Sequence, residues 1–401
     1  MIAPDTPPSA AENLLFFAPI ASWPATHGGS LRTARLFEEL CRQGRKGVLI
    51  GTNFDYRIAG ETSEVRKRKN TERGKMSGAL IGLVTNEHYL RAKQLTPTLV
   101  THFLTVVAEE KPDRIIMSYL YTGELLPLLP PGVEVIIDTH NNDWEWFGNL
   151  RDSTSNPVKR HLCDLSLQRT SGYVDALSGA VKLMHVSQAD FDAYAEARPD
   201  MTHLLVPNGC DPKPRQSQPP YPTEPAELLF VGSLSSQMNQ DALNHFASEF
   251  WPRLQGQARL TVLGSAPPSQ VAELCNQFGW RLLPDADSAT LDRAYEDAHY
   301  AILPFAYGAG SKLKLAEACG RAVPVLSTSA GTTGVTDLPE SVFVSDAPDA
   351  WGAHLATFQM SRALRDESIA FAEKHSWAAV ADELDTHLRP ESTPRPEPLT
   401  A

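Results

Sequence analysis

The chain has 401 residues, of which 42% are hydrophobic, so it is too long for one ordinary domain and long enough for two. Its formal net charge of −12 disfavours a nucleic-acid partner, because surfaces that bind nucleic acids are basic. The five cysteines are scattered without Cys-x-x-Cys spacing, which disfavours a zinc site and favours a reducing compartment.

The predicted elements begin after a Pro- and Ala-rich tail, residues 1–12, which lacks the basic and apolar regions of a signal peptide. No stretch reaches the ~20 apolar residues that span a bilayer, so we expect a cytoplasmic protein. The run Asn13–Ala18 predicts a strand, and Leu31–Arg42 predicts an amphipathic helix. Gly28 and Gly29 precede that helix, where they either fix a tight turn or let a ligand approach the backbone. The Gly-x-Gly-x-x-Gly fingerprint of dinucleotide binding is missing.

A strongly basic segment follows at residues 60–75 of this otherwise acidic chain. Its cations are Arg66, Lys67, Arg68, Lys69, Arg73 and Lys75. The sequence predicts a loop here, and two interpretations remain open. The cations are either an ordinary solvated surface or, over residues 66–75, a contact with an anionic acceptor or the inner face of a membrane, since clustered cations favour anionic headgroups.

Polar residues gather at the end of a predicted buried strand, Val133–Asp138. Asp138 is followed by Thr-His-Asn-Asn-Asp, and α/β sheets place their ligand chemistry at the carboxyl ends of strands. Asp138 and His140 are therefore candidate site residues, with a structural histidine as the alternative. Three aromatic residues just downstream could line an acceptor pocket or pack beneath it: Trp144, Trp146 and Phe147.

The composition changes at residues 212–225, where six prolines in fourteen residues indicate a linker between two domains. The predicted segments are a tail at 1–12, a first domain at 13–211, the linker at 212–225, a second domain at 226–375, a terminal helix at 376–388 and a tail at 389–401.

The second domain opens with the apolar run Glu227–Val231, which predicts a strand that leads into Gly232 and Ser233. Further along, Ala301–Leu303 predicts a buried strand, and a helix is expected over Lys312–Cys319. The loop between them has two glycines and little side-chain bulk: Gly308, Ala309, Gly310 and Ser311. A glycine loop before a helix N-terminus offers free N–H groups to an anion, although an ordinary βαβ crossover has the same pattern.

The predicted helix carries ionisable residues near its start. Lys312 and Lys314 lie in its first turn, where they oppose the helix dipole, so a bound anion would relieve the conflict. Lys314 and Glu317 are three residues apart and share a face of the helix.

Residues 308–318 resemble the donor-site motif of retaining GT-B glycosyltransferases, family 4 (glycosyl transferases group 1), in a Gly-rich branch with exopolysaccharide and cell-surface sugar transferases. The branch pattern is Gly-Gly-Gly-Thr-Arg-x-Lys-x-x-Glu-Ala, and this chain has Gly-Ala-Gly-Ser-Lys-Leu-Lys-Leu-Ala-Glu-Ala. Residues 204–211 resemble the hinge motif of that family, and 230–252 resemble the opening of its second domain. The chain departs from the larger family at Ala309, where a second Glu is common, and it lacks the basic pair that often follows the strand at Gly232.

The resemblance implies an α/β protein with the GT-B fold, in which two Rossmann-like domains with parallel sheets face a central cleft. It implies that the helix at 376–388 crosses back to the first domain. The implied reaction moves a sugar from a nucleotide-diphosphate sugar to an acceptor hydroxyl, with retention of configuration and without a metal or other cofactor. The identity of the acceptor stays open.

The resemblance also implies roles for single residues. Glu317 would hold the nucleotide ribose, and His140 would lie near the reacting sugar. We infer that Lys312 and Lys314 replace the missing basic pair at the diphosphate. The remaining candidate substrate-binding residues are Gly28, Gly29, Asp138, Gly232, Ser233, Gly308, Ala309, Gly310 and Ser311. Two alternatives remain, a GT-B-fold sugar-nucleotide epimerase and a nucleotide-sugar-binding protein without transfer activity.

Overall fold

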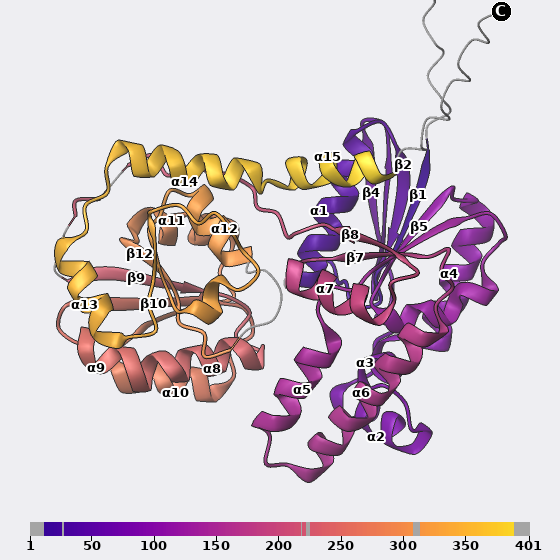
Figure 1. The fold of residues 1–401 in the computed structure, drawn as a ribbon, viewed down its shortest axis with the longest axis horizontal. Coiled ribbons are helices and arrows are strands. Elements are labelled where there is room, and N and C mark those ends of the chain that lie inside the picture. The colour runs from indigo at the N-terminus through magenta and orange to yellow at the C-terminus, as the bar shows by residue number, and fades with distance from the viewer. Residues whose placement is uncertain (1–11, 26–27, 218, 222–224, 308–312, 389–401) are drawn as a thin grey trace, which may run out of the picture.

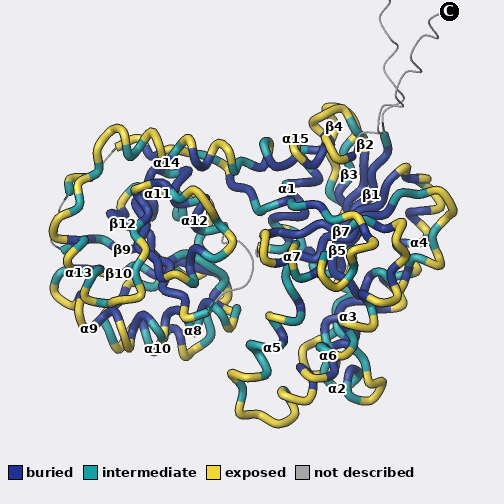
Figure 2. The backbone as a smooth tube through the Cα atoms, in the orientation of Figure 1, coloured by how far each residue is buried: buried dark blue, intermediate teal, exposed yellow. Residues whose placement is uncertain are grey.

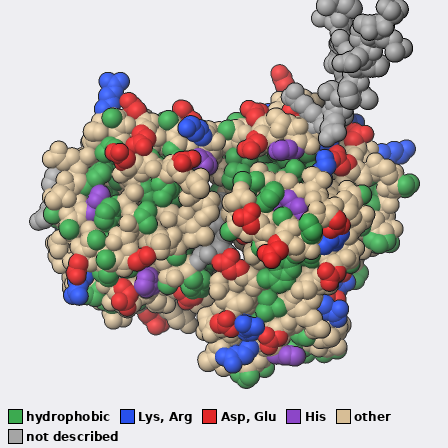
Figure 3. Space-filling view, viewed as in Figure 1, with side chains coloured by type: hydrophobic (Ala, Val, Ile, Leu, Met, Phe, Trp, Pro, Cys, Tyr) green, Lys and Arg blue, Asp and Glu red, His purple; other side chains and the backbone are tan. Residues whose placement is uncertain are grey.

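The computed structural model describes residues 12–25, 28–217, 219–221, 225–307 and 313–388, which form two α/β domains (Figure 1). The predicted tails lie outside the described residues, apart from Glu12. On the face drawn in Figure 3, acidic and basic side chains are interspersed over both domains. Among the described residues, no helix is long and apolar enough to cross a membrane.

The first sheet has the strand order β4-β3-β2-β1-β5-β6-β7-β8. Its strands are β1 (Asn13–Phe17), β2 (Lys46–Ile50), β3 (Phe54–Ala59), β4 (Thr62–Lys67), β5 (Arg114–Ser118), β6 (Glu134–Asp138), β7 (Lys182–His185) and β8 (Thr202–Leu205). The six strands β2-β1-β5-β6-β7-β8 are parallel to one another, which confirms the predicted sheet type. The exception is an antiparallel hairpin of β3 and β4 at the edge.

The predicted loop over residues 60–75 is therefore wrong for its first half, which contains strand β4. The apolar pattern that marks a buried strand is missing here because β4 is an edge strand with mostly exposed side chains. Charged residues on an edge strand also discourage pairing with other chains. The helices of the first domain are α1 (Gly28–Arg42), α2 (Lys75–Thr85), α3 (Tyr89–Gln94), α4 (Pro97–Glu110), the 3₁₀-helix η1 (Leu120–Leu128), α5 (Asp143–Ser153), α6 (Pro157–Ala176) and α7 (Gln188–Ala197).

The second sheet is parallel throughout its described strands, with the order β11-β10-β9-β12-β13-β14. Its strands are β9 (Ala226–Val231), β10 (Ala258–Gly264), β11 (Arg281–Pro284), β12 (Tyr300–Leu303), β13 (Val325–Ser327) and β14 (Val342–Val344). The later helices are α8 (Gln237–His245), the π-helix η2 (Phe246–Phe250), α9 (Trp251–Leu254), α10 (Ser269–Phe278), α11 (Ser288–Asp297), α12 (Leu313–Gly320), the 3₁₀-helix η3 (Ser329–Thr332), α13 (Pro348–Thr357), α14 (Arg362–Lys374) and α15 (Trp377–Leu388).

Strand β1 illustrates why a continuous apolar run folds into the centre of the first sheet. All five of its residues are buried. Leu15 and Phe17 belong to the core on one face of the sheet, whereas Leu14 and Phe16 belong to the core on the other. Successive strand residues point to opposite faces, so a strand that is covered on both faces needs apolar residues at every position.

The last helix, α15, packs on the first domain although its sequence follows the second. Trp377 and Leu384 belong to the same core as Leu14 of β1, and Figure 2 shows α15 alongside α1. The chain crosses between the domains twice at one place, because Cys210 N donates to His375 O at 2.8 Å and Trp377 N donates to Cys210 O at 3.0 Å.

Candidate functional site

Two helix N-termini meet between the domains. Helix α1 begins at Gly28, three residues before the predicted start at Leu31. A Cβ added at Gly28 would lie 3.1 Å from Cδ1 of Leu313, the first residue of α12. The absence of a side chain therefore lets α1 extend by nearly one turn towards the second domain. Free N–H groups and the positive end of the dipole lie at a helix N-terminus, so this junction favours an anion.

Gly29 lies in the first turn of α1, where its carbonyl accepts a hydrogen bond from Thr33 Oγ1 at 3.0 Å. The loop before α12 contains five of the predicted site residues, and all five lie outside the described residues: Gly308, Ala309, Gly310, Ser311 and Lys312. Their contacts with a ligand stay predictions.

Lys314 reaches from α12 to the carboxyl end of β9. Its Nζ donates to Asn239 Oδ1 at 2.7 Å, and Asn239 Nδ2 in turn donates to the carbonyl of Ser233 at 2.8 Å. A Cβ at Gly232 would lie 2.9 Å from Lys314 Cε, so the glycine creates the space for the lysine. Its Nζ also lies 5.0 Å from the ring centroid of Phe305, within the range of a cation–π contact. The structure thus brings together Lys314, Gly232 and Ser233.

Glu317 lies one turn further along α12. Its Oε1 is 3.8 Å from Arg321 Nη2, and the Tyr295 hydroxyl forms a hydrogen bond with its carboxylate. Burial raises the pKa of Glu317, while the positive charges of Arg321 and Lys314 act in the opposite direction. The side chain is still 30% exposed, so a ligand can reach it. A carboxylate accepts about four hydrogen bonds, which leaves room for further donors.

In the first domain, Asp138 at the end of β6 forms a buried ion pair with Arg32 of α1. Arg32 Nε lies 2.8 Å from Asp138 Oδ2, and the two side chains are 1% and 4% exposed. Arg32 Nη1 also donates to the carbonyl of Pro207 at 2.9 Å. Burial opposes ionisation of Asp138, but Arg32 and His140 outweigh it and lower the pKa of Asp138. Among the described residues, Arg32 Nη2 has no hydrogen-bond partner.

His140 follows β6 and stacks on Tyr119, which follows the neighbouring strand β5. Their ring centroids are 4.6 Å apart at an interplanar angle of 13°. His140 has φ 61° and Tyr119 has φ 71°, a region that costs side-chain-bearing residues on the order of 1–3 kcal/mol each. Strained backbone at the ends of two adjacent strands is typical of functional sites. His140 Nε2 lies 3.5 Å from Asp138 Oδ2.

Asp143, the first residue of α5, is a buried carboxyl group near this pair of rings. It is 2% exposed, and its Oδ1 has no hydrogen-bond partner among the described residues. Burial and the charge of Asp190 raise the pKa of Asp143 to about 7. Burial also raises the pKa of Tyr119, with Asp143 and Asp138 as further causes. A carboxyl group with this pKa can exchange a proton near neutral pH.

Three residues of this cluster were not predicted from the sequence: Arg32, Tyr119 and Asp143. The spacing of residues could have identified Arg32. It lies four residues before Leu36 and eight before Leu40, which places it on the buried stripe of α1. A cation on such a stripe indicates a buried partner.

The aromatic residues after His140 lie on α5. Phe147 is 1% exposed and packs in the core, which fits the interpretation that these aromatic residues pack beneath a pocket and do not line it. Trp144 Nε1 donates to Ser171 Oγ at 3.0 Å, and its ring lies 4.9 Å from that of Tyr194. Trp146 packs against the same core.

The basic segment divides into structural and exposed cations. Arg68 Nε donates to Asp55 Oδ1 at 2.9 Å and Nη2 donates to the carbonyl of Gly51 at 2.7 Å. Arg66 and Lys67 are exposed and border a hollow of about 350 Å³. This hollow lies at the β4 edge of the first sheet and is lined by His102 and Val106 of α4. Helix α4 packs on the face of the sheet opposite to that covered by α1, so the hollow is not part of the junction between α1 and α12.

Within the described residues, no group of three or more His, Cys, Asp or Glu side chains is arranged to hold a metal ion. The contacts instead form two clusters, one around Arg32, Asp138 and His140 and the other around Lys314 and Glu317. The clusters are linked because Gly28 contacts α12, and Arg32 lies one turn from Gly28 on the same side of α1.

Residues 225–358 match the family model described as "Glycosyl transferases group 1". A comparison of the sequence with curated proteins finds no match. Among solved structures, the chain is similar to sucrose-phosphate synthase from Thermosynechococcus elongatus, with 13% identity and a TM-score of 0.66, over 94% of this chain and 98% of that one.

Two further structures have the same architecture. WaaG, a glycosyltransferase involved in lipopolysaccharide biosynthesis, has 13% identity and a TM-score of 0.61, over 92% of this chain and 98% of that one. Anabaena HepE in complex with UDP has 12% identity and a TM-score of 0.59, over 94% and 99%. The predicted fold is confirmed: the chain has the α/β architecture of GT-B glycosyltransferases, and its second domain matches glycosyl transferases group 1, which supports glycosyl transfer as the class of activity.

Proposed function

We propose that the protein moves a sugar from a nucleoside-diphosphate sugar to the hydroxyl group of an acceptor. The observation that carries this proposal is the meeting of the N-termini of α1 and α12, at Gly28 and Leu313, next to the residue Lys314. Two helix N-termini and an ammonium group suit a diphosphate, which carries more charge than a single N-terminus compensates. The complex of Anabaena HepE with UDP supports a nucleotide donor for this fold.

The second domain binds the donor in this proposal. Glu317 accepts hydrogen bonds from the ribose hydroxyls alongside its bond from Tyr295. The bond between the sugar and the diphosphate breaks, so negative charge grows on the leaving diphosphate. Lys314, Lys312 and the N–H groups of residues 308–311 stabilise that charge, and groups fixed in advance around developing charge lower the barrier. Because cations and helix termini supply this stabilisation, we propose a reaction without a metal or other cofactor.

The first domain holds the acceptor. His140, supported by Asp138 and stacked on Tyr119, lies near the reacting sugar, and Gly28 and Gly29 face the diphosphate. The resemblance of residues 308–318 to retaining enzymes supports retention of configuration. We also propose a cytoplasmic site of action, with residues 66–75 available to an anionic acceptor or membrane.

A two-stage experiment tests the function. A panel of nucleotide sugars is first screened by thermal shift, and the stabilising donor is then incubated with and without candidate acceptor glycans and lipids. We expect release of nucleoside diphosphate that depends on the acceptor, with the sugar recovered on the acceptor. Interconversion of the sugar without an acceptor would identify an epimerase, and binding without turnover against any acceptor would identify a binding protein. Either outcome contradicts the proposal.

A further inference from the structure

Helix α2 has its large apolar side chains on the exposed side. Its sequence, KMSGALIGLVT, contains no acidic residue, and only Gly78 and Gly82 are buried. Met76, Leu80 and Val84 are 88%, 62% and 77% exposed. These three recur every four residues, so they form one stripe along the helix. A helix of a soluble domain normally turns such a stripe to the core, so this stripe fits an apolar partner outside the molecule.

The orientation of α2 follows from its glycines. A Cβ at Gly78 would lie 2.9 Å from Lys93 Cβ on α3, and a Cβ at Gly82 would lie 3.3 Å from the carbonyl of Glu87. The glycine face is therefore the face that fits closely against α3. Rotation of α2 to bury Leu80 would push a bulky side chain into that contact, so the stripe stays exposed.

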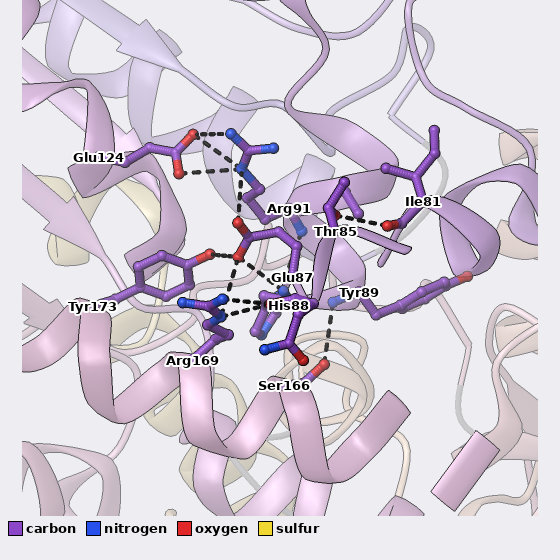
Figure 4. Close-up of polar contacts among 12 residues, drawn as sticks. Ile81, Thr85, Glu87, His88, Tyr89, Arg91, Glu124, Ser166, Arg169 and Tyr173 are labelled. Carbon is purple, nitrogen blue, oxygen red and sulfur yellow. Dashed lines mark hydrogen bonds and ion pairs between the residues drawn. The ribbon is translucent and has the colours of Figure 1, made fainter. Parts of the chain in front are cut away.

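Polar contacts fix the carboxyl end of α2, as Figure 4 shows around Glu87. Asn86, the left-handed C-cap of α2, accepts two hydrogen bonds from Arg169, at 2.8 Å and 2.6 Å. Tyr173 donates to Glu87 at 2.7 Å, and Arg169 belongs with Tyr173 to α6. The stripe is thus presented by a helix that is anchored to α6.

An apolar pocket of about 240 Å³ lies beside the stripe, between α2, α3, α5 and α6. Its wall includes Ala79, Tyr89, Phe147 and Leu162, together with the side chains of Lys75 and Lys159. These four helices project from one end of the first domain in Figure 1, so the pocket and the stripe lie on one protruding region. An apolar hollow whose wall includes two lysine side chains suits an anionic lipid, because the stems of lysines can cover apolar surface while their charges stay in water.

The charges around the stripe also select an anionic partner. Lys75 begins α2, and Lys159 and Arg160 lie in the first turn of α6 beside Val158, which is 54% exposed. The chain as a whole carries a net charge of −12, which would repel an anionic membrane from most of its surface. A local basic rim around apolar side chains is the combination that an interfacial helix needs.

We propose that the exposed stripe of α2, with the rim formed by Lys75 and Lys159, docks on an anionic lipid bilayer. Met76, Leu80 and Val84 enter the headgroup region, and the pocket beside Ala79 takes part of a lipid chain. This inference adds the apolar stripe and the pocket of α2 to the membrane contact proposed for residues 66–75, of which Lys75 is one. It does not depend on sugar transfer, because binding to vesicles is measured without donor or acceptor.

Vesicle flotation of the full chain tests the docking. We compare vesicles of phosphatidylcholine alone with vesicles of phosphatidylcholine and phosphatidylglycerol, for the parent and for a variant with Met76→Gln, Leu80→Gln and Val84→Gln. The variant should lose at least about tenfold in partition to the mixed vesicles, since three apolar side chains no longer enter the lipid. Leu128→Gln is the matched control, because Leu128 is 57% exposed on η1, outside α2, and its binding should equal that of the parent.

A second variant tests the charged rim. Lys75→Ala with Lys159→Ala should lower binding to the mixed vesicles about tenfold or more and should leave binding to phosphatidylcholine unchanged. Unaltered circular dichroism and melting temperature establish that the variants fold. The proposal is overturned if the triple variant binds like the parent. It is equally overturned if the parent ignores vesicles but forms a dimer that the triple variant does not form, because the stripe would then join two copies of the chain.

Discussion

In the second domain, the candidate site consists of residues close together in the sequence, whereas in the first domain it consists of residues that only the fold brings together. Lys314 and Glu317 lie on one helix and were recognised from a local motif. Arg32 and Asp138 are 106 residues apart and form an ion pair with almost no exposure. The cluster of Lys314 and Glu317 can change without disturbing the core, while the ion pair of Arg32 and Asp138 is part of the core. We therefore expect substitutions in the second domain to alter ligand binding, and those in the first domain to alter stability as well.

The largest effect is expected for Arg32→Ala. Removal of one partner leaves the Asp138 carboxylate buried without its cation, which costs about 3–5 kcal/mol in the free energy of unfolding. Urea denaturation measures this loss. Arg35→Ala on the same helix is the control, because its side chain is 35% exposed and its ion pair with Asp211 should contribute at most about 1 kcal/mol. If the two variants lost the same free energy of unfolding, burial would not explain the contribution of the pair of Arg32 and Asp138.

The buried carboxyl group of Asp143 should make stability depend on pH. Its pKa is raised to about 7 in the folded protein, whereas an unfolded Asp titrates at about 3.9, so the contribution of this group to stability should fall as pH rises from about 4 to about 7. Buried His88 and His185, whose pKa values are lowered to about 3, act in the opposite direction over this range, so the titration of Asp143 is measured as the difference between variant and parent. Asp143→Asn removes this titration, and we expect the variant to be more stable above pH ~7 by on the order of 3 kcal/mol. Denaturation curves across this pH range provide the measurement.

The control for this prediction is Asp152→Asn, also on α5, where the side chain is 69% exposed. It should leave the pH dependence almost unchanged. If Asp143→Asn lowers activity without any change in the pH dependence of stability, the group acts in the reaction but keeps an ordinary pKa.

In the second domain, Lys314→Ala should lower kcat more than it weakens binding of the free nucleoside diphosphate. Its proposed partner is charge that grows as the bond breaks, and loss of one such donor costs about 10²-fold in kcat. Steady-state kinetics and calorimetry separate the two quantities. Lys213→Ala is the matched control, since Lys213 is 62% exposed in an ion pair with Asp292 and should leave kcat as in the parent.

The smallest of these effects is expected for Glu317→Ala. Ribose hydroxyls would lose a charged acceptor, which is worth about 1.5–3 kcal/mol of donor affinity. Glu317→Gln should fall between the parent and the alanine variant because it keeps the shape and loses the charge. Glu273→Ala, an exposed residue of α10, controls for the loss of one negative charge. A folded alanine variant with the affinity of the parent would exclude the ribose role.

The fold was largely predictable because its central strands are continuous apolar runs, of which β1 is the example. The hairpin of β3 and β4 was not predicted. Strand β4 is a mostly polar edge strand without a periodic signal, whereas β3 lies inside the sheet and has the alternating pattern Phe-Asp-Tyr-Arg-Ile-Ala. In the second domain, Lys314 lies beside Gly232, where the motif predicts a basic side chain, and its role at a diphosphate stays a prediction.

The first-domain site was predicted only in part. Asp138 and His140 could be found because they follow a recognisable strand. Their partners Arg32 and Tyr119 could not, because the ion pair and the stacked rings depend on which strands become neighbours. The pKa of Asp143 depends on burial and on Asp190 of α7, which no local pattern reveals.

The return of α15 to the first domain has a consequence for protein synthesis. Helix α15 contributes Trp377, Val380, Ala381, Leu384 and Leu388 to a core whose other buried members lie before residue 207. A ribosome must therefore make the whole second domain before the first can bury Leu14 and Phe16 fully on that face. During that interval the nascent first domain exposes an apolar surface that chaperones recognise. Truncation before residue 377 should consequently make the first domain aggregate, although every residue of its sheet is present.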